Sequence, residues 1–205
     1  NQFNFHHYTV DVTKAFEEAV IDNFVEEYLS GRTPNPCVIC NRKIKWEEML
    51  KKADSLDTKY VATGHYGIID YNKESNRYTL KRSSDNRKDH SYALWGLTQE
   101  SLSRTLFPLG DMHKDEVRKL ATELGLKTAS KPDSQEICFA ADNNYERFLR
   151  ERIPDVIDKI NAGDMIYQGK KIGQHKGIPF YTVGQRRGLG VAVGKPVYVK
   201  NINTD

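Results

Sequence analysis

The sequence predicts an α/β fold with a parallel sheet, followed by a small β-rich domain. Helical apolar spacing alternates with short strand-like segments over residues 1–144, a pattern typical of parallel α/β layers. From Tyr145 onward the composition changes, and residues 145–205 hold 8 of the 14 glycines. That segment also carries 11 Lys and Arg against 6 Asp and Glu, whereas residues 1–144 carry 20 against 22. We therefore predict two domains, 1–144 and 145–205.

Apolar spacing predicts the first elements in order. Alternation over residues 8–12 indicates a short strand, and residues 13–31 have the spacing of a helix that ends at a glycine. Two prolines within residues 32–37 predict an extended loop. A second helix is expected to begin near Cys40 and to run past Ala53.

The rest of the first domain shows strand and helix signals in turn. Residues 59–63 indicate a strand, residues 67–82 a hairpin, and residues 99–106 and 114–124 helices, the last with its apolar residues facing inward. Few parallel strands are evident where a doubly wound sheet has about five. No glycine-rich phosphate loop precedes the first helix. The α/β part therefore looks truncated.

The second domain is expected to open with a helix over residues 145–152. Short strands between glycine turns are predicted at 165–167, 180–183 and 196–200. The basic balance of this domain fits a polyanionic partner and fits an ordinary solvated basic face equally well.

Composition narrows the class of protein. The chain is 205 residues long, with 38% hydrophobic and 29% charged residues, as in soluble globular proteins. It shows neither an apolar run of membrane-spanning length nor a signal peptide, so we expect a cytoplasmic protein without a membrane partner. Three cysteines are too few, and odd in number, for a secreted disulfide scaffold.

The strongest chemical signal is the segment 35–45, which holds Cys37, Cys40 and three basic residues. A helix N-terminus and nearby cations both favour thiolate, so Cys40 is a candidate reactive thiol rather than a structural one. The same Cys-x-x-Cys spacing is found in redox pairs and in half of a zinc site. Zinc needs four ligands, and a second pair is missing, although histidines could complete the set.

Four further segments carry polar residues that suit a site. Residues 131–139 place Cys138 in a polar loop, and residues 62–66 lie at the carboxyl end of a predicted strand, where open α/β sheets bind ligands. Residues 87–92 form a polar loop that would equally suit plain solvent exposure. Residues 181–190 combine glycine turns with two arginines, which suits phosphate contact or a simple basic hairpin.

Taken in order, these segments resemble blocks of the tRNA-specific 2-thiouridylase family, over nearly the whole chain. The matching blocks are residues 31–44, 62–66, 88–92, 132–139 and 173–190.

The resemblance implies a doubly wound, adenine-nucleotide α-hydrolase-like domain with ATP-pyrophosphatase chemistry, a small central domain and a C-terminal barrel. Residues 1–144 would be the later part of the first domain, and residues 145–205 the central domain that contacts tRNA. The chain is thus expected to be an internal part of such an enzyme. Without the N-terminal pyrophosphate loop and the C-terminal barrel, it is expected to be inactive by itself.

The implied reaction is the ATP-dependent 2-thiolation of a tRNA wobble uridine, with Mg²⁺. By resemblance, Cys138 carries a persulfide loaded by a sulfur-donor protein, and Cys40 attacks it to release sulfur. The target base must leave its stack to be reached. The resemblance also implies binding residues: for ATP, Gly64; for the target base, Asn35, Pro36 and Cys37; for tRNA, His65, Lys88, Asp89 and His90.

Two residues depart from the family pattern. His90 stands where members usually carry Gln, which puts that tRNA contact in doubt. Cys37 stands where many members carry Asp, which adds a third thiol to the expected site.

Three other functions stay open from the residues. One is an ATP-pyrophosphatase that adenylates a small carbonyl substrate, which the basic second domain disfavours. Another is a non-catalytic RNA-binding module. The third is an iron–sulfur cluster on the three cysteines, which we do not favour because such clusters most often take four cysteines.

Overall fold

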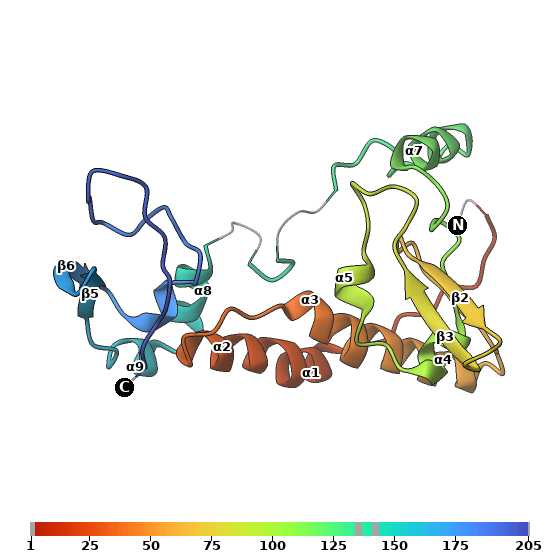
Figure 1. The fold of residues 1–205 in the computed structure, drawn as a ribbon. Coiled ribbons are helices and arrows are strands. Elements are labelled where there is room, and N and C mark those ends of the chain that lie inside the picture. The colour runs from red at the N-terminus through yellow and green to blue at the C-terminus, as the bar shows by residue number, and fades with distance from the viewer. Residues whose placement is uncertain (1–2, 134–136, 141–143, 205) are drawn as a thin grey trace. The chain divides into compact units, whose positions relative to one another are not determined.

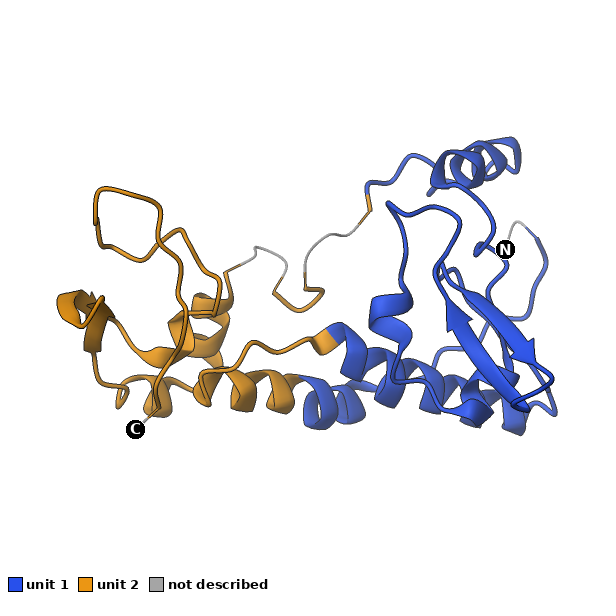
Figure 2. Ribbon diagram, in the orientation of Figure 1, with its two compact units in different colours: residues 1–20, 37–132 blue, residues 21–36, 133–205 orange. Residues whose placement is uncertain are grey.

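The computed structural model describes residues 3–133, 137–140 and 144–204. It divides into two compact units, coloured separately in Figure 2. Unit 1 comprises residues 1–20 and 37–132, and unit 2 comprises residues 21–36 and 133–205. Unit 2 therefore includes a segment from near the start of the chain. Within the described ranges, no helix combines the length and the apolar composition needed to cross a bilayer.

A helical run follows the N-terminal segment (Figure 1). It consists of α1 (Thr13–Phe16), a π-helical turn (Glu17–Ile21) and α2 (Asp22–Leu29). The run confirms the predicted helix, and it stops where Gly31 takes a φ of +67°, which favours glycine. The strand predicted at 8–12 is wrong, since those residues form no strand. Three alternating apolar residues do not hold an extended segment without a partner strand.

The second helical run carries two of the cysteines. It consists of α3 (Pro36–Ile39), a π-helical segment (Cys40–Trp46) and α4 (Glu47–Ser55). The prediction of an extended loop up to Cys37, with a helix starting near Cys40, is wrong because the helix already starts at Pro36. Proline is tolerated at the first helical position, where its fixed φ suits the helix and its missing N–H costs no bond.

A parallel pair of strands confirms the expected parallel pairing. β1 (Val61–Ala62) pairs with β4 (Thr105–Leu106) in parallel. The helix predicted over residues 99–106 is shorter than expected, because α6 ends at Ser103 and the last two residues join β4 (α6 is Gln99–Ser103).

The predicted hairpin is confirmed as β2 (Ile68–Asn72) paired antiparallel with β3 (Arg77–Lys81). After the hairpin come α5 (Ser91–Leu94), then α6 and β4, and then α7 (Lys114–Glu123). The existence of α7 is confirmed, but its apolar face is not inward as predicted, since none of its residues is buried.

The core of unit 1 forms around Trp46, which is packed with Leu94, Leu97 and Leu102. The Trp46 indole Nε1–H donates to Thr105 Oγ1 at 2.7 Å. This core fixes the helical run that carries Cys40 against β4 and α5.

Unit 2 packs around a separate core. Its elements beyond α2 are α8 (Tyr145–Arg152), α9 (Pro154–Ile157), β5 (Gly163–Tyr167), β6 (Lys170–His175) and a 3₁₀ turn (Ile178–Phe180). Side chains of α2 and α8 meet the glycine-rich segment in the core, which includes Phe24, Tyr28, Leu149, Phe180 and Leu189.

The predictions for unit 2 were partly right. The helix at 145–152 and the strand at 165–167 are confirmed. The strands predicted at 180–183 and 196–200 are wrong, because neither segment forms a strand. Backbone hydrogen bonds join Val199 to residues 184–185, but the glycine turns that follow interrupt any regular pairing.

Candidate active site

The candidate thiols of unit 1 lie on one helical run. Cys37 is exposed in the first turn, and Cys40 is half-buried where the π-helical segment begins. π-Helical turns are rare and often mark functional sites. The next residues include exposed Arg42, Lys43 and Lys45. Cys40 therefore lies in a segment that carries three exposed cationic side chains.

Asn41 fastens this helical run to α5. Its side chain is 3% exposed, and its Nδ2 donates to the backbone oxygen of Ala93 at 3.0 Å. Since α5 begins directly after residues 88–90, this bond ties the Cys40 helix to the loop expected to contact tRNA. Sequence reasoning did not single out Asn41. Its position three residues before the buried Ile44, on the same helix face, was the available signal.

Gly64 lies just beyond the carboxyl end of β1 and is open to solvent. A Cβ built at this position would meet only Leu109 Cδ1, at 3.8 Å. The described chain therefore does not need glycine here for its own packing. An open glycine at the end of a parallel strand fits a backbone that an adenine nucleotide approaches closely.

His65 is held as a neutral imidazole. Its Nδ1 lies 2.9 Å from Thr63 Oγ1, and its ring centroid lies 5.3 Å from that of Trp46 and 5.5 Å from that of His90. Burial lowers the pKa of His65 to about 4, and the positive charge of Lys45 acts in the same direction. At neutral pH the ring is therefore an uncharged aromatic surface with hydrogen-bonding nitrogens.

His90 joins its loop to the strand end by two bonds. Its backbone N–H donates to the Tyr66 carbonyl at 2.8 Å, and its Nδ1 accepts from the Tyr66 N–H at 3.1 Å. An accepting Nδ1 carries no proton, so the neutral ring bears its proton on Nε2. Burial lowers the pKa of His90, in keeping with this neutral form. The structure thus brings the Gly64–His65 segment and residues 88–90 together.

Asp89 shapes the same loop. Its Oδ1 accepts from the backbone N–H groups of Ser83 (3.1 Å) and Ser91 (3.2 Å), and its Oδ2 accepts from Ser91 Oγ (2.7 Å). Burial alone would raise the pKa of Asp89, but these bonds outweigh it and lower the pKa. The carboxylate therefore helps to hold the loop at the start of α5, a role that the sequence pattern did not indicate.

The remaining predicted site residues belong to unit 2. Asn35 and Cys138 are exposed and Pro36 is buried. Residues 134–136 of the Cys138 segment lie outside the described residues. The pairing of Cys40 with Cys138, one from each unit, stays a prediction.

Mg²⁺ is the metal ion that the family resemblance implies. No group of three His, Cys, Asp or Glu side chains in the described part of the chain is placed to hold a metal ion.

Comparisons with known proteins match both parts of the chain. Residues 1–142 match the family model described as "tRNA methyl transferase HUP domain", and residues 146–205 match "tRNA methyl transferase PRC-barrel domain". The HUP description agrees with the adenine-nucleotide α-hydrolase-like fold that the sequence predicted.

Close relatives carry a consistent name. The chain is 50% identical over 206 residues to the tRNA-specific 2-thiouridylase MnmA of Salinibacter ruber, covering 100% of this chain and 54% of that protein. It is 54% identical over 199 residues to the MnmA of Natranaerobius thermophilus, covering 97% and 53%. MnmA 1 of Thermoanaerobacter pseudethanolicus is 53% identical over 205 residues, covering 100% and 56%. The chain spans about half the length of these curated relatives.

Proposed function

We propose, since the chain belongs to the family of tRNA-specific 2-thiouridylases, that it takes part in replacing the C2 oxygen of a tRNA wobble uridine with sulfur. The observation that carries the proposal is a set of hydrogen bonds in unit 1 that joins three segments of the candidate site. The Asn41–Ala93 bond joins the Cys40 helix to α5, and the His90–Tyr66 bonds join the adjacent loop to the open Gly64. A thiol, a nucleotide-accessible backbone and a polar loop thus belong to one rigid framework.

The uridine C2 oxygen is a poor leaving group, and adenylation by ATP supplies AMP as a better one. Gly64 suits nucleotide approach because it follows the carboxyl end of β1 and because no described residue comes closer to its Cβ position than ordinary contact.

The sulfur step uses two cysteines of the chain. A thiolate at Cys40 attacks Sγ of a Cys138 persulfide, whose S–S bond breaks. Hydrosulfide leaves and adds to C2, where it displaces AMP. The remaining Cys40–Cys138 disulfide must be reduced by a thiol before the next turnover. The sulfur itself comes from a persulfide-carrying donor protein.

The neighbouring residues suit a flipped base. The neutral rings of His65, which contacts Trp46, and of His90 offer stacking surfaces and hydrogen-bonding nitrogens for an uncharged pyrimidine. Lys88 supplies positive charge in the same loop for the phosphate backbone.

The test is a thiolation assay on the intact protein. It is incubated with tRNA, a persulfide-carrying sulfur-donor protein and a reducing thiol, with and without ATP, and the tRNA is digested for mass spectrometry. We expect 2-thiouridine only with ATP, and none from Cys40→Ser. The same spectrum distinguishes thiolated from methylated uridine. AMP release that does not need tRNA, without any thiolated nucleoside, would instead favour an ATP-pyrophosphatase with a small carbonyl substrate.

A further inference from the structure

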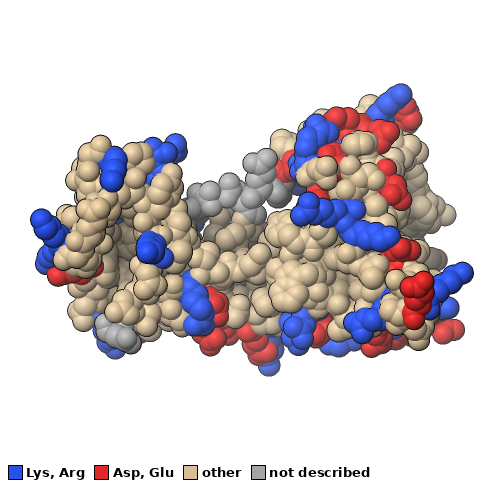
Figure 3. All heavy atoms as spheres, viewed as in Figure 1, with Lys and Arg blue, Asp and Glu red and all other residues tan. Residues whose placement is uncertain are grey.

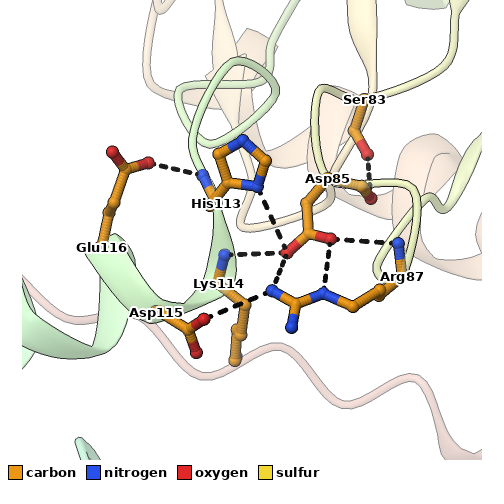
Figure 4. Close-up of polar contacts among 7 residues, drawn as sticks. All are labelled: Ser83, Asp85, Arg87, His113, Lys114, Asp115 and Glu116. Carbon is orange, nitrogen blue, oxygen red and sulfur yellow. Dashed lines mark hydrogen bonds and ion pairs between the residues drawn. The ribbon is translucent and has the colours of Figure 1, made fainter.

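Asp85 is a buried charge that the proposed chemistry does not use. Its side chain is 2% exposed, although it lies in the polar loop between β3 and α5. Burying a carboxylate is costly unless hydrogen bonds and a counter-charge compensate it. The contacts drawn in Figure 4 show how this carboxylate is compensated.

The first set of contacts closes the loop on itself. Asp85 Oδ1 accepts from the Arg87 backbone N–H at 3.0 Å, and the Arg87 guanidinium binds both carboxylate oxygens, at 3.1 and 3.2 Å. The Asp85 backbone oxygen accepts from Ser83 Oγ at 3.0 Å and from the Lys88 N–H at 2.9 Å. One residue therefore sets the path of the chain up to Lys88.

The second set joins the loop to α7. Asp85 Oδ2 accepts from the Lys114 backbone N–H at 3.0 Å, in the first turn of that helix, and lies 3.9 Å from His113 Nδ1. A carboxylate at a helix N-terminus is favourable because the N–H groups there have no partner within the helix. Lys114 Nζ also lies 5.8 Å from the Tyr66 ring, beside the backbone that His90 binds. Loop and helix thus meet at Tyr66.

The charge state supports this reading. The hydrogen bond from the Arg87 side chain, followed by that from the Lys114 backbone, lowers the pKa of Asp85 well below its usual range. Asp115 Oδ2 also accepts from the Arg87 guanidinium, at 3.3 Å, but Asp115 is 81% exposed. The two aspartates thus share one arginine and differ in burial.

We propose that Asp85 is a positioning residue for tRNA binding: its buried carboxylate fixes the loop of residues 83–91 against α7, so that Lys88 and His90 meet tRNA in one arrangement. The inference rests on the proposed function, because it needs tRNA as the ligand. Asp85 itself touches no substrate and acts through the loop.

The test uses the intact protein with Asp85→Asn, a neutral side chain of the same shape, and Asp115→Asn as the matched control. We expect Asp85→Asn to weaken tRNA binding about tenfold in a filter assay, and to raise KM for tRNA while KM for ATP stays within about twofold. Asp115→Asn is expected to match the wild type. Unchanged tRNA affinity in a folded Asp85→Asn protein would overturn the inference.

A double-mutant cycle separates positioning from general stability. If Asp85 acts through Lys88, then Lys88→Ala costs affinity in the wild type and little more in the Asp85→Asn background. Additive losses would overturn the inference. Should Asp85→Asn not fold, Arg87→Gln replaces it in the same cycle, with the same two readings. A wild-type protein that binds no tRNA would overturn the proposed function as well, whereas an active wild type with additive losses overturns this inference alone.

Discussion

Each unit carries a segment proposed to contact tRNA, and the two segments are built differently. In unit 1, side-chain bonds from Asp85, Asp89 and His90 hold the loop of residues 83–91. In unit 2, the turn over residues 184–190 depends on glycine conformation, with φ values of +89°, +74° and +70° at its three glycines. The first segment is held mainly by buried or half-buried side chains. The second combines glycine conformation with the Gln185 side chain, which accepts from the Thr182 N–H and donates to the Arg187 oxygen, each at 3.0 Å.

The arginines of the two segments also differ in their ion pairs. Exposed Arg186 and Arg187 make no ion pair with any described residue, whereas Arg87 binds Asp85 and Asp115. In Figure 3 the visible charged side chains around β5 and β6 are mostly Lys and Arg, while acidic and basic side chains are mixed around α7. We infer that unit 1 contacts tRNA through side chains held in fixed positions. Unit 2 attracts the tRNA phosphates through its positive charge.

The largest expected effect is the loss of unfolding free energy when a glycine of unit 1 is replaced by alanine. A Cβ at Gly110 would lie 2.1 Å from the Gly67 oxygen, so Gly110→Ala requires backbone movement and is expected to cost more than about 4 kcal/mol of unfolding free energy. At Gly190 a Cβ meets no atom of the described residues within 4 Å, so the positive φ is what opposes alanine there, at about 1–2 kcal/mol. Thermal unfolding of both variants gives the comparison. Equal losses would mean that unit 1 is no more tightly packed than the turn.

His90 tests the side-chain bonds of the loop. His90→Ala leaves the Tyr66 N–H without its acceptor and is expected to cost about 1–3 kcal/mol of unfolding free energy. His90→Gln restores an accepting oxygen and is expected to cost clearly less. Urea unfolding measures both variants. If Gln is as damaging as Ala, the ring contacts of His90 matter more than its acceptor.

A pH dependence follows from the two histidines. The pKa of His65 is lowered to about 4 and that of His90 is also lowered, whereas the unfolded chain has values of about 6.5. The unfolded state therefore binds more protons between these values, and stability falls as pH drops from about 6.5 toward 4. We expect His65→Asn to flatten this fall in melting temperature. If the melting temperatures of the variant and the wild type fall in parallel as pH drops, His65 is not the origin of the pH dependence.

The smallest effect is expected in unit 2. Arg186→Ala with Arg187→Ala should reduce the slope of log affinity against log salt by at most about 2, and to the same extent for unrelated RNAs. Filter binding at several salt concentrations measures the slope. An unchanged slope would show that these arginines face away from RNA.

The sequence predicted which helices and hairpins exist better than it predicted where each one begins and ends. The helices at 13–29 and 145–152 and the hairpin near residue 70 came from apolar spacing and turn residues. The helix start at Pro36 was missed because proline either breaks a helix or begins one, depending on context.

The bonding within the site was not predictable. The motifs marked Cys40, Gly64 and His90 as separate segments, but the bonds of Asn41 to Ala93 and of Asp85 to Lys114 join residues far apart in the chain. Such partners are chosen by tertiary packing, which leaves no periodic trace in the sequence. The exposure of the apolar side of α7 was not predicted for the same reason. Periodicity shows that a helix has an apolar face, but it does not show what covers that face.

The central claim is that Cys138 carries the sulfur as a persulfide and that Cys40 attacks this persulfide to release the sulfur. The direct measurement is 2-thiouridine formed by the intact protein and its Cys→Ser variants at 37, 40 and 138, beside iron content after anaerobic purification. The account predicts no product from the variants at Cys40 and Cys138, and reduced but measurable product from Cys37→Ser. Equal loss of product and of iron in all three variants would contradict it and would favour an iron–sulfur cluster instead.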